Sequence, residues 1–107
     1  MTAVGSNTIS LRGISGASYE FWIYSWGQEF KAVGGVYAVL RAEGGSFRVL
    51  YIGQTGDLSE RFENHHKAGC FDRNRKTHIA AMTESSESRR LMVEKDLIAG
   101  YNPGCNG

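Results

Sequence analysis

A glutamate lies within the apolar stripe of a helix predicted near the end of the sequence. Residues 85–99 are expected to be helical, and at 100° per residue Leu91, Leu97 and Ile98 project within about 60° of Glu94. A buried carboxylate is costly unless it is paired or binds a metal. Glu94 is therefore expected to belong either to a structural ion pair or to a functional site, and periodicity alone leaves both open.

Residues 57–68 predict a second helix that carries two polar side chains on an otherwise apolar face. Leu58, Arg61, His65 and Ala68 follow one another at helical spacing and so share that face. A single histidine there would more often be a hydrogen-bonded core residue than a catalyst. Two polar residues on one helix, together with an inward glutamate on another, favour a site.

The cysteines and other histidines offer a zinc site as the less favoured alternative. The candidate ligands are His65, His66, His78, Cys70 and Cys105. Their spacing in the sequence matches no usual zinc pattern. Two cysteines do not make a disulfide framework, and both are expected to be free thiols. The aromatic residues between positions 19 and 26 are expected to fill a core rather than to stack on bases.

The remaining pattern predicts an α+β fold, a small, mainly antiparallel sheet flanked by helices. Asp57 is placed to cap the helix over residues 57–68, and Gly69 to end it. The turn around Gly44 and Gly45 predicts a hairpin. Strands are expected over residues 8–11, 19–26, 36–41, 47–52 and 77–82.

The bulk properties fit one small domain. The chain has 107 residues and a formal net charge of +1, which does not indicate a general coat for nucleic acid. One basic cluster stands out, formed by Arg73, Arg75 and Lys76 with Lys67 before it; a phosphate contact and a solvated loop are both left open. No apolar run could span a bilayer and no signal peptide is seen, so we expect no membrane and an intracellular protein.

Two short motifs and the sequence after them resemble the GIY-YIG nuclease family. Residues 35–37 read GVY and residues 51–53 read YIG, with Val36 in place of the first motif's isoleucine. Residues 51–61, YIGQTGDLSER, are similar to the family pattern YIG-x-T-x-x-L-x-x-R. Residues 94–106, EKDLIAGYNPGCN, are similar to the family ending E-x-x-L-I-x-x-Y-x-P-x-x-N.

The resemblance assigns roles to five residues. Tyr37 matches the tyrosine that activates water, and Tyr51 matches the second tyrosine that lines the site. Arg61 matches the arginine that stabilises charge on the scissile phosphate. His65 matches the residue that relays the tyrosine proton. Glu94 matches the single carboxylate that holds one divalent metal, expected to be Mg²⁺ or Mn²⁺.

Two further positions follow from the same match. Asn106 corresponds to the asparagine that braces the site, because the family spacing counts from Pro103. Asn102 is the less favoured candidate for the same role. Gln54 stands where some relatives carry a lysine, which implies a weaker phosphate contact. The resemblance begins at Gly35, so the single domain over residues 1–107 would carry an N-terminal extension or extra strand over residues 1–33.

The implied function is a metal-dependent endonuclease. Water would attack the phosphorus in line, the 3′ oxygen would leave, and DNA is expected rather than RNA on family grounds. Gly35 and Gly53 would allow backbone and substrate to approach the tyrosines. A non-catalytic nucleic-acid-binding module is the main alternative, and a purely structural domain the other. A homodimer or a partner protein is left open as the source of specificity.

Overall fold

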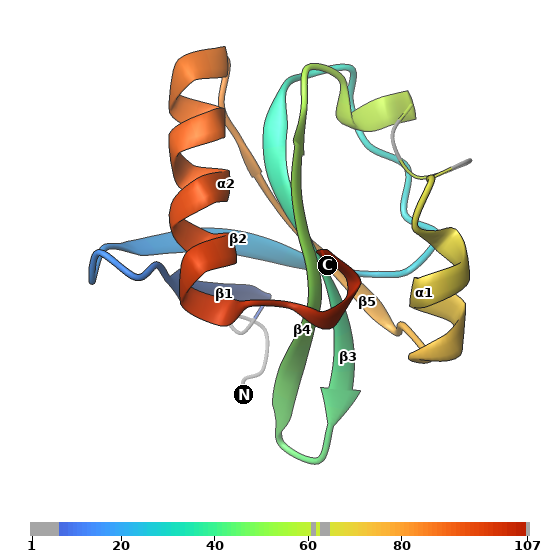
Figure 1. The fold of residues 1–107 in the computed structure, drawn as a ribbon. Coiled ribbons are helices and arrows are strands. Elements are labelled where there is room, and N and C mark those ends of the chain that lie inside the picture. The colour runs from blue at the N-terminus through green and yellow to red at the C-terminus, as the bar shows by residue number, and fades with distance from the viewer. Residues whose placement is uncertain (1–6, 61, 63–64, 107) are drawn as a thin grey trace.

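One curled antiparallel sheet forms the centre of the molecule (Figure 1). The computed structural model describes residues 7–60, 62 and 65–106, so Arg61 lies outside the described residues. In that part of the chain the strand order is β1-β2-β5-β3-β4. The predicted α+β fold is confirmed. The strands are β1 (Thr8–Arg12), β2 (Ser18–Ser25), β3 (Gly35–Glu43), β4 (Ser46–Thr55) and β5 (His78–Thr83).

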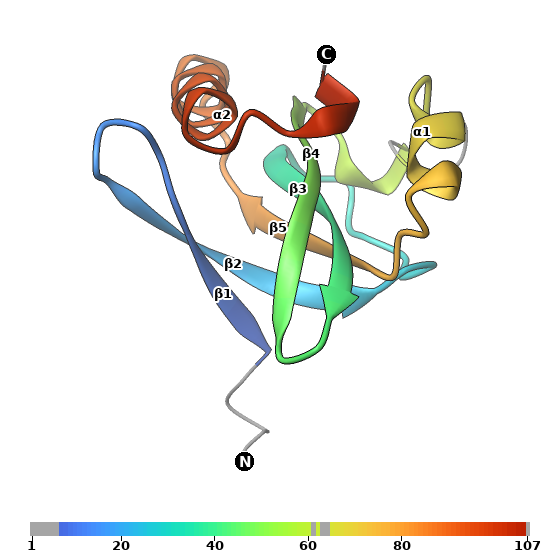
Figure 2. The same ribbon diagram turned by 60° about the horizontal axis from the view of Figure 1, so that its bottom comes forward.

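Two α-helices lie on either side of the β3–β4 hairpin (Figures 1 and 2). They are α1 (Ala68–Arg73) and α2 (Glu87–Tyr101). Two short 3₁₀ helices, η2 (Leu58–Glu60) and η3 (Gly104–Asn106), lie before α1 and after α2. Among the helices of the described residues, none is both long and apolar enough to cross a membrane.

The β3–β4 hairpin is the element on which the candidate site is built. Its two strands pair as predicted, and Gly44 in the turn has a φ of 61°, which glycine adopts without the usual penalty. β3 also pairs with β5, so both edges and both faces of β3 are covered. This explains why residues 36–40 are all apolar instead of alternating with polar residues.

Side chains from the two faces of the sheet form two separate core clusters. On one face Val36 and Ile52 pack with Val93 of α2. On the other face Tyr37 and Tyr51 pack with core residues that include Phe71 of α1, Leu58 and Cys105. Because neighbouring residues of a strand point to opposite faces, β3 and β4 contribute to both clusters.

The helix predicted over residues 57–68 is wrong within the described residues. Asp57 does accept a hydrogen bond from the Ser59 amide, but its carboxylate also accepts one from the Ser59 hydroxyl, at 2.9 and 2.5 Å. Such local bonds give the backbone an alternative to a continuing helix, and only the 3₁₀ turn η2 follows. The α-helix begins later, at Ala68, so Gly69 lies inside α1 rather than ending a helix.

The prediction of free thiols is also wrong. Cys70 of α1 and Cys105 of η3 form a disulfide, with their Cα atoms 5.9 Å apart. The two residues are 35 positions apart in the sequence, and only the fold brings them to the same side of the sheet. The disulfide fixes the C-terminal segment to α1, across the face that carries the two tyrosines.

The N-terminal third contributes the β1–β2 hairpin, and its two strands agree with those predicted over residues 8–11 and 19–26. β1 forms the edge of the sheet and pairs with β2, and β2 pairs with the central strand β5. The turn of this hairpin is fixed to α2 by Asp96. That carboxylate accepts hydrogen bonds from the Ser15 amide at 2.9 Å, the Ser15 hydroxyl at 2.7 Å and the Tyr19 hydroxyl at 2.8 Å.

Candidate functional site

Two tyrosines and a histidine meet on the α1 side of the sheet. Tyr37 of β3 lies opposite Gly53, and Tyr51 of β4 lies two positions away, so both side chains point to the same face. Their ring centroids are 6.0 Å apart. The His65 ring lies 5.0 Å from that of Tyr51, and its Nε2 lies 2.7 Å from Tyr37 Oη. The fold therefore brings three of the predicted site residues together.

The proton on the His65 ring is located by a main-chain contact. The backbone N–H of Lys67 donates to His65 Nδ1 at 3.0 Å. An amide N–H can only donate, so Nδ1 must present its lone pair and the neutral ring carries its proton on Nε2. His65 Nε2–H then donates to Tyr37 Oη, which stabilises negative charge on that oxygen.

Gly53 allows Tyr37 to lie across β4. A Cβ on Gly53 would stand 2.6 Å from Tyr37 Oη and 2.8 Å from the Tyr51 ring, too close for any other residue. Gly35 is required for a different reason from the one expected. A Cβ there would meet the Met82 carbonyl oxygen at 2.5 Å, so the crowding comes from the neighbouring strand and not from an approaching substrate.

Tyr37 is completely enclosed. Its exposed fraction is 0%, and that of His65 is 5%. The Phe62 ring packs edge-on against Tyr37 at 4.9 Å. The hydroxyl can therefore act on a water molecule only if the side chains that cover it move.

The sequence interpretation missed two members of this group. Phe62 forms part of the cover over Tyr37, and His66 stacks on His65 with ring centroids 4.6 Å apart and an interplanar angle of 15°. His66 is exposed, so it is the imidazole at the surface of the group. Two consecutive histidines in the sequence were a signal for this pair of rings. In the helix predicted over residues 57–68, however, the second histidine would point away from the site.

Asn106 braces the outer edge of β4. Its side chain accepts from the Ile52 amide at 2.9 Å and donates to the Ile52 carbonyl at 2.9 Å. β4 ends the sheet, so this pair of bonds replaces a neighbouring strand at the position next to Tyr51. Asn102 has a separate structural role, since it ends α2 in the left-handed conformation with a φ of 46°.

Glu94 is not at the centre of a buried stripe, and that prediction is wrong. The buried residues of α2 are Arg90, Val93 and Leu97, whereas Leu91 is 47% exposed. The prediction took Leu91 as core and did not consider Arg90, so the buried face lies further round the helix. Glu94 is half-buried at its margin. It comes from the α2 side of β4, while the tyrosines and His65 lie on the α1 side.

A single carboxylate is compatible with magnesium but not with a zinc site. In the described part of the chain, no three His, Cys, Asp or Glu side chains gather as metal ligands. Zn²⁺ in proteins normally takes three or four such ligands, and both cysteines are used in the disulfide. Mg²⁺ takes oxygen ligands and keeps several waters, so the half-buried Glu94 carboxylate fits that ion.

The predicted phosphate contacts are the neutral Gln54 and four cations, and they differ in their surroundings. Gln54 accepts a hydrogen bond from Arg90 Nε at 3.0 Å. Lys76 pairs with Asp72 at 2.5 Å and also lies over the Trp26 ring. The other three contacts are Lys67, half-buried at the start of α1, and the exposed Arg73 and Arg75.

Comparisons of the chain with protein-family models, with curated proteins and with solved structures found no significant match.

Proposed function

We propose that this chain is a metal-dependent endonuclease that acts inside the cell on phosphodiester bonds, of DNA rather than RNA. The observation that supports this most directly is the 2.7 Å hydrogen bond between Tyr37 Oη and His65 Nε2, beside Tyr51. A tyrosine is a poor base near neutrality unless its neighbours favour the phenolate. A buried imidazole N–H aimed at the hydroxyl oxygen is such a neighbour.

In the proposed reaction, the side chains that cover Tyr37 move and its hydroxyl first loses its proton to solvent. The resulting phenolate takes a proton from the attacking water while the water oxygen attacks the phosphorus in line. The bond to the 3′ oxygen breaks, that oxygen takes a proton from solvent, and the products carry a 3′-hydroxyl and a 5′-phosphate. His65 stabilises the phenolate before it is protonated. Arg61, by the family resemblance, would neutralise charge on the non-bridging oxygens.

Glu94 would hold one Mg²⁺ or Mn²⁺ on the α2 side of the edge strand β4, so a phosphate that meets both the ion and Tyr37 would have to lie across that edge. Asn106 would keep β4 in place beside Tyr51. When bound, the ion supplies Lewis-acid stabilisation of the negative charge that builds up on the phosphate and the leaving oxygen. Specificity would come from a homodimer or from a partner protein.

The enclosure of Tyr37 favours a second candidate function, a nucleic-acid-binding module without turnover. With 0% of Tyr37 exposed, the proposed base is inaccessible to water in this conformation. In such a module the tyrosine–histidine pair would serve only to hold β3, β4 and the segment before α1 together.

The experiment that tests the proposal is cleavage of supercoiled plasmid and of labelled duplex, branched and single-stranded oligonucleotides. Each substrate is incubated with Mg²⁺, with Mn²⁺ and with a chelator. We expect metal-dependent cleavage by the parent protein. The cleavage rate of Glu94→Ala should be lower by about a hundredfold or more, because one group that stabilises transition-state charge is removed. Glu87→Ala is the matched control, an exposed glutamate of the same helix.

Equal cleavage by the parent and Glu94→Ala would overturn the role of Glu94. If the folded parent cuts no substrate but shifts DNA in a metal-free mobility assay, the binding module replaces the nuclease. If it neither cuts nor binds, both functions are wrong.

A further inference from the structure

Arg90 is a buried cation whose hydrogen-bond acceptors among the described residues are all uncharged. It is 7% exposed, at the first turns of α2. Its Nε donates to Gln54 Oε1 at 3.0 Å, and its Nη1 donates to the carbonyl oxygens of Glu84 and Ser85 at 2.9 and 3.0 Å. Three of its five N–H groups are thus used, and every acceptor is neutral.

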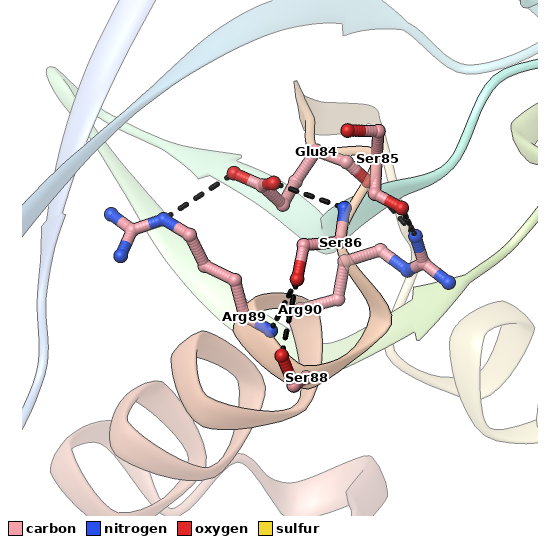
Figure 3. A network of polar contacts seen from close by, with 6 residues as sticks. All are labelled: Glu84, Ser85, Ser86, Ser88, Arg89 and Arg90. Atoms are coloured by element: carbon pink, nitrogen blue, oxygen red, sulfur yellow. Dashed lines mark hydrogen bonds and ion pairs between the residues drawn. The ribbon is translucent and has the colours of Figure 1, made fainter.

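The next residue of the helix shows the contrast. Arg89 forms an ion pair with Glu84 at 3.3 Å, and the two arginine side chains leave the helix in different directions (Figure 3). Among the described residues no carboxylate pairs with Arg90, and no acceptor is bound to its Nη2. That nitrogen faces the loop after β4, 3.8 Å from where a Cβ of Gly56 would lie.

A buried guanidinium without an anion is an unfavourable arrangement. Removing a charge from water is costly, and neutral acceptors recover only part of the lost hydration. Glu84 is paired with Arg89, and Asp57 accepts two hydrogen bonds from Ser59. Among the described residues, neither Glu87 nor Glu94, the glutamates of the same helix, forms an ion pair with Arg90. The guanidinium therefore has capacity for an external anion at Nη2, where two N–H groups can bind oxygen atoms.

We propose that Arg90 binds a non-bridging oxygen of a nucleic-acid backbone phosphate, adjacent to the phosphate that is cleaved. Arg90 is one helical turn before Glu94, about 6 Å along α2, and is joined through Gln54 to the end of β4. The existence of the anion site rests on Arg90 alone. Its assignment to a DNA phosphate rests on the proposed nuclease function.

The first test uses inorganic phosphate as the probe. Phosphate is titrated into the parent protein, with sodium chloride at matched ionic strength as the control, and the Arg90 Nε–H signal is followed by ¹H–¹⁵N NMR. We expect saturable shifts with phosphate and none with chloride. In Arg90→Gln, phosphate binding measured from the remaining signals should weaken roughly ten- to a hundredfold, whereas Arg89→Gln should bind as the parent does.

A second pair of variants avoids the risk that Arg90→Gln fails to fold. Gly56 is exposed and has an ordinary φ, so a side chain fits there. Gly56→Glu places a carboxylate within reach of Nη2 and should abolish phosphate binding while keeping or raising the melting temperature. Gly56→Gln has the same shape without the charge and should still bind phosphate. Equal phosphate binding in both Gly56 variants would overturn the proposal.

Metal-free DNA binding then separates the site from the proposed function. Losing one phosphate contact should reduce the slope of log affinity against log salt by about 0.9 in Gly56→Glu, with Gly56→Gln unchanged. If the parent binds phosphate at Arg90 but neither cuts nor binds DNA, the anion site stands and the nuclease does not. If the parent cuts DNA while Gly56→Glu retains the salt slope of the parent, the Arg90 inference is wrong and the nuclease stands.

Discussion

At the residue scale, the chemistry of His65 is set by a main-chain group. Because the Lys67 amide occupies Nδ1, the neutral ring reaches Tyr37 as a donor. The family resemblance implied that this histidine relays the tyrosine proton. In the resting structure Nε2 already carries a proton, so in the proposed reaction His65 would stabilise the phenolate instead of taking the tyrosine proton. A doubly protonated ring would set an N–H at Nδ1 against the N–H of Lys67.

We expect long-range ¹H–¹⁵N NMR at neutral pH to show His65 as the neutral ring protonated on Nε2. In Tyr37→Phe the tautomer should persist, because the Lys67 amide is unchanged. The same variant leaves the buried Nε2–H without its acceptor and should lose about 1–3 kcal/mol of unfolding free energy. A proton on Nδ1 in the parent would contradict the assignment. His66→Gln identifies which ring signal belongs to His65.

At the element scale, the disulfide joins the two pieces of chain that complete the site. Cys70 lies in α1, which follows His65, and Cys105 lies next to Asn106 in η3. The closed loop spans 35 positions, for which loop entropy gives a stabilisation of about 4 kcal/mol. In a reducing compartment the bond would open, so stability there would be lower.

We expect the double variant Cys70→Ser, Cys105→Ser to be less stable by up to about 4 kcal/mol in urea unfolding. Dithiothreitol should lower the unfolding free energy of the parent protein towards that of the double variant. Dithiothreitol should have no effect on the double variant, which serves as the control. Two free thiols per chain in a thiol assay of the unreduced parent would contradict the disulfide.

The contact between the β1–β2 turn and α2 should make stability depend on pH. Hydrogen bonds from the Ser15 hydroxyl and amide, and then from Tyr19, hold the pKa of the Asp96 carboxyl below its usual value. A group with a lowered pKa in the folded state stabilises the protein above its unfolded pKa, about 3.9 for aspartate. That contribution disappears as the pH falls through the lower folded value.

We therefore expect Asp96→Asn to be less stable than the parent at neutral pH, with the difference shrinking as the pH falls below about 4. Urea unfolding from neutral to acid pH measures it. Glu87→Gln removes one negative charge from the same helix without this contact and is the control. A difference that stays constant at all pH values would mean that the ionised carboxylate of Asp96 does not contribute.

The strands could be predicted from the sequence, but the faces of the helices could not. Short apolar runs and the glycine turn between them are local signals, and they located β3, β4 and their pairing. The face of α2 depends on Arg90, a cation buried against the carbonyls of Glu84 and Ser85, which no periodicity of apolar residues predicts. His65 shows the same limit. Its place beside Tyr37 was expected from the family spacing, although the helix that was to carry it does not form.

At the scale of the whole molecule, the charge is too evenly balanced for strong non-specific binding. The formal net charge is +1, so any affinity for DNA would have to come from a few local cations. Lys76 is neutralised by Asp72. The exposed arginines of the predicted basic cluster, Arg73 and Arg75, lie at the end of α1 and just beyond it. If DNA is bound across this end of the molecule, these two residues carry much of the salt dependence.

We expect Arg73→Gln, Arg75→Gln to bind DNA more weakly than the parent without metal. The slope of log affinity against log salt should become shallower by about 1.8, because two phosphate contacts are lost. Fluorescence anisotropy of a labelled duplex over a range of salt concentrations measures it. The matched control is Arg41→Gln, Arg48→Gln, which removes two arginines that pair with Glu43 on the β3–β4 hairpin. Equal effects of the two double variants would show that overall charge, and not this surface, governs binding. If the salt slope changes only in the control variant, the DNA binds at the β3–β4 hairpin instead.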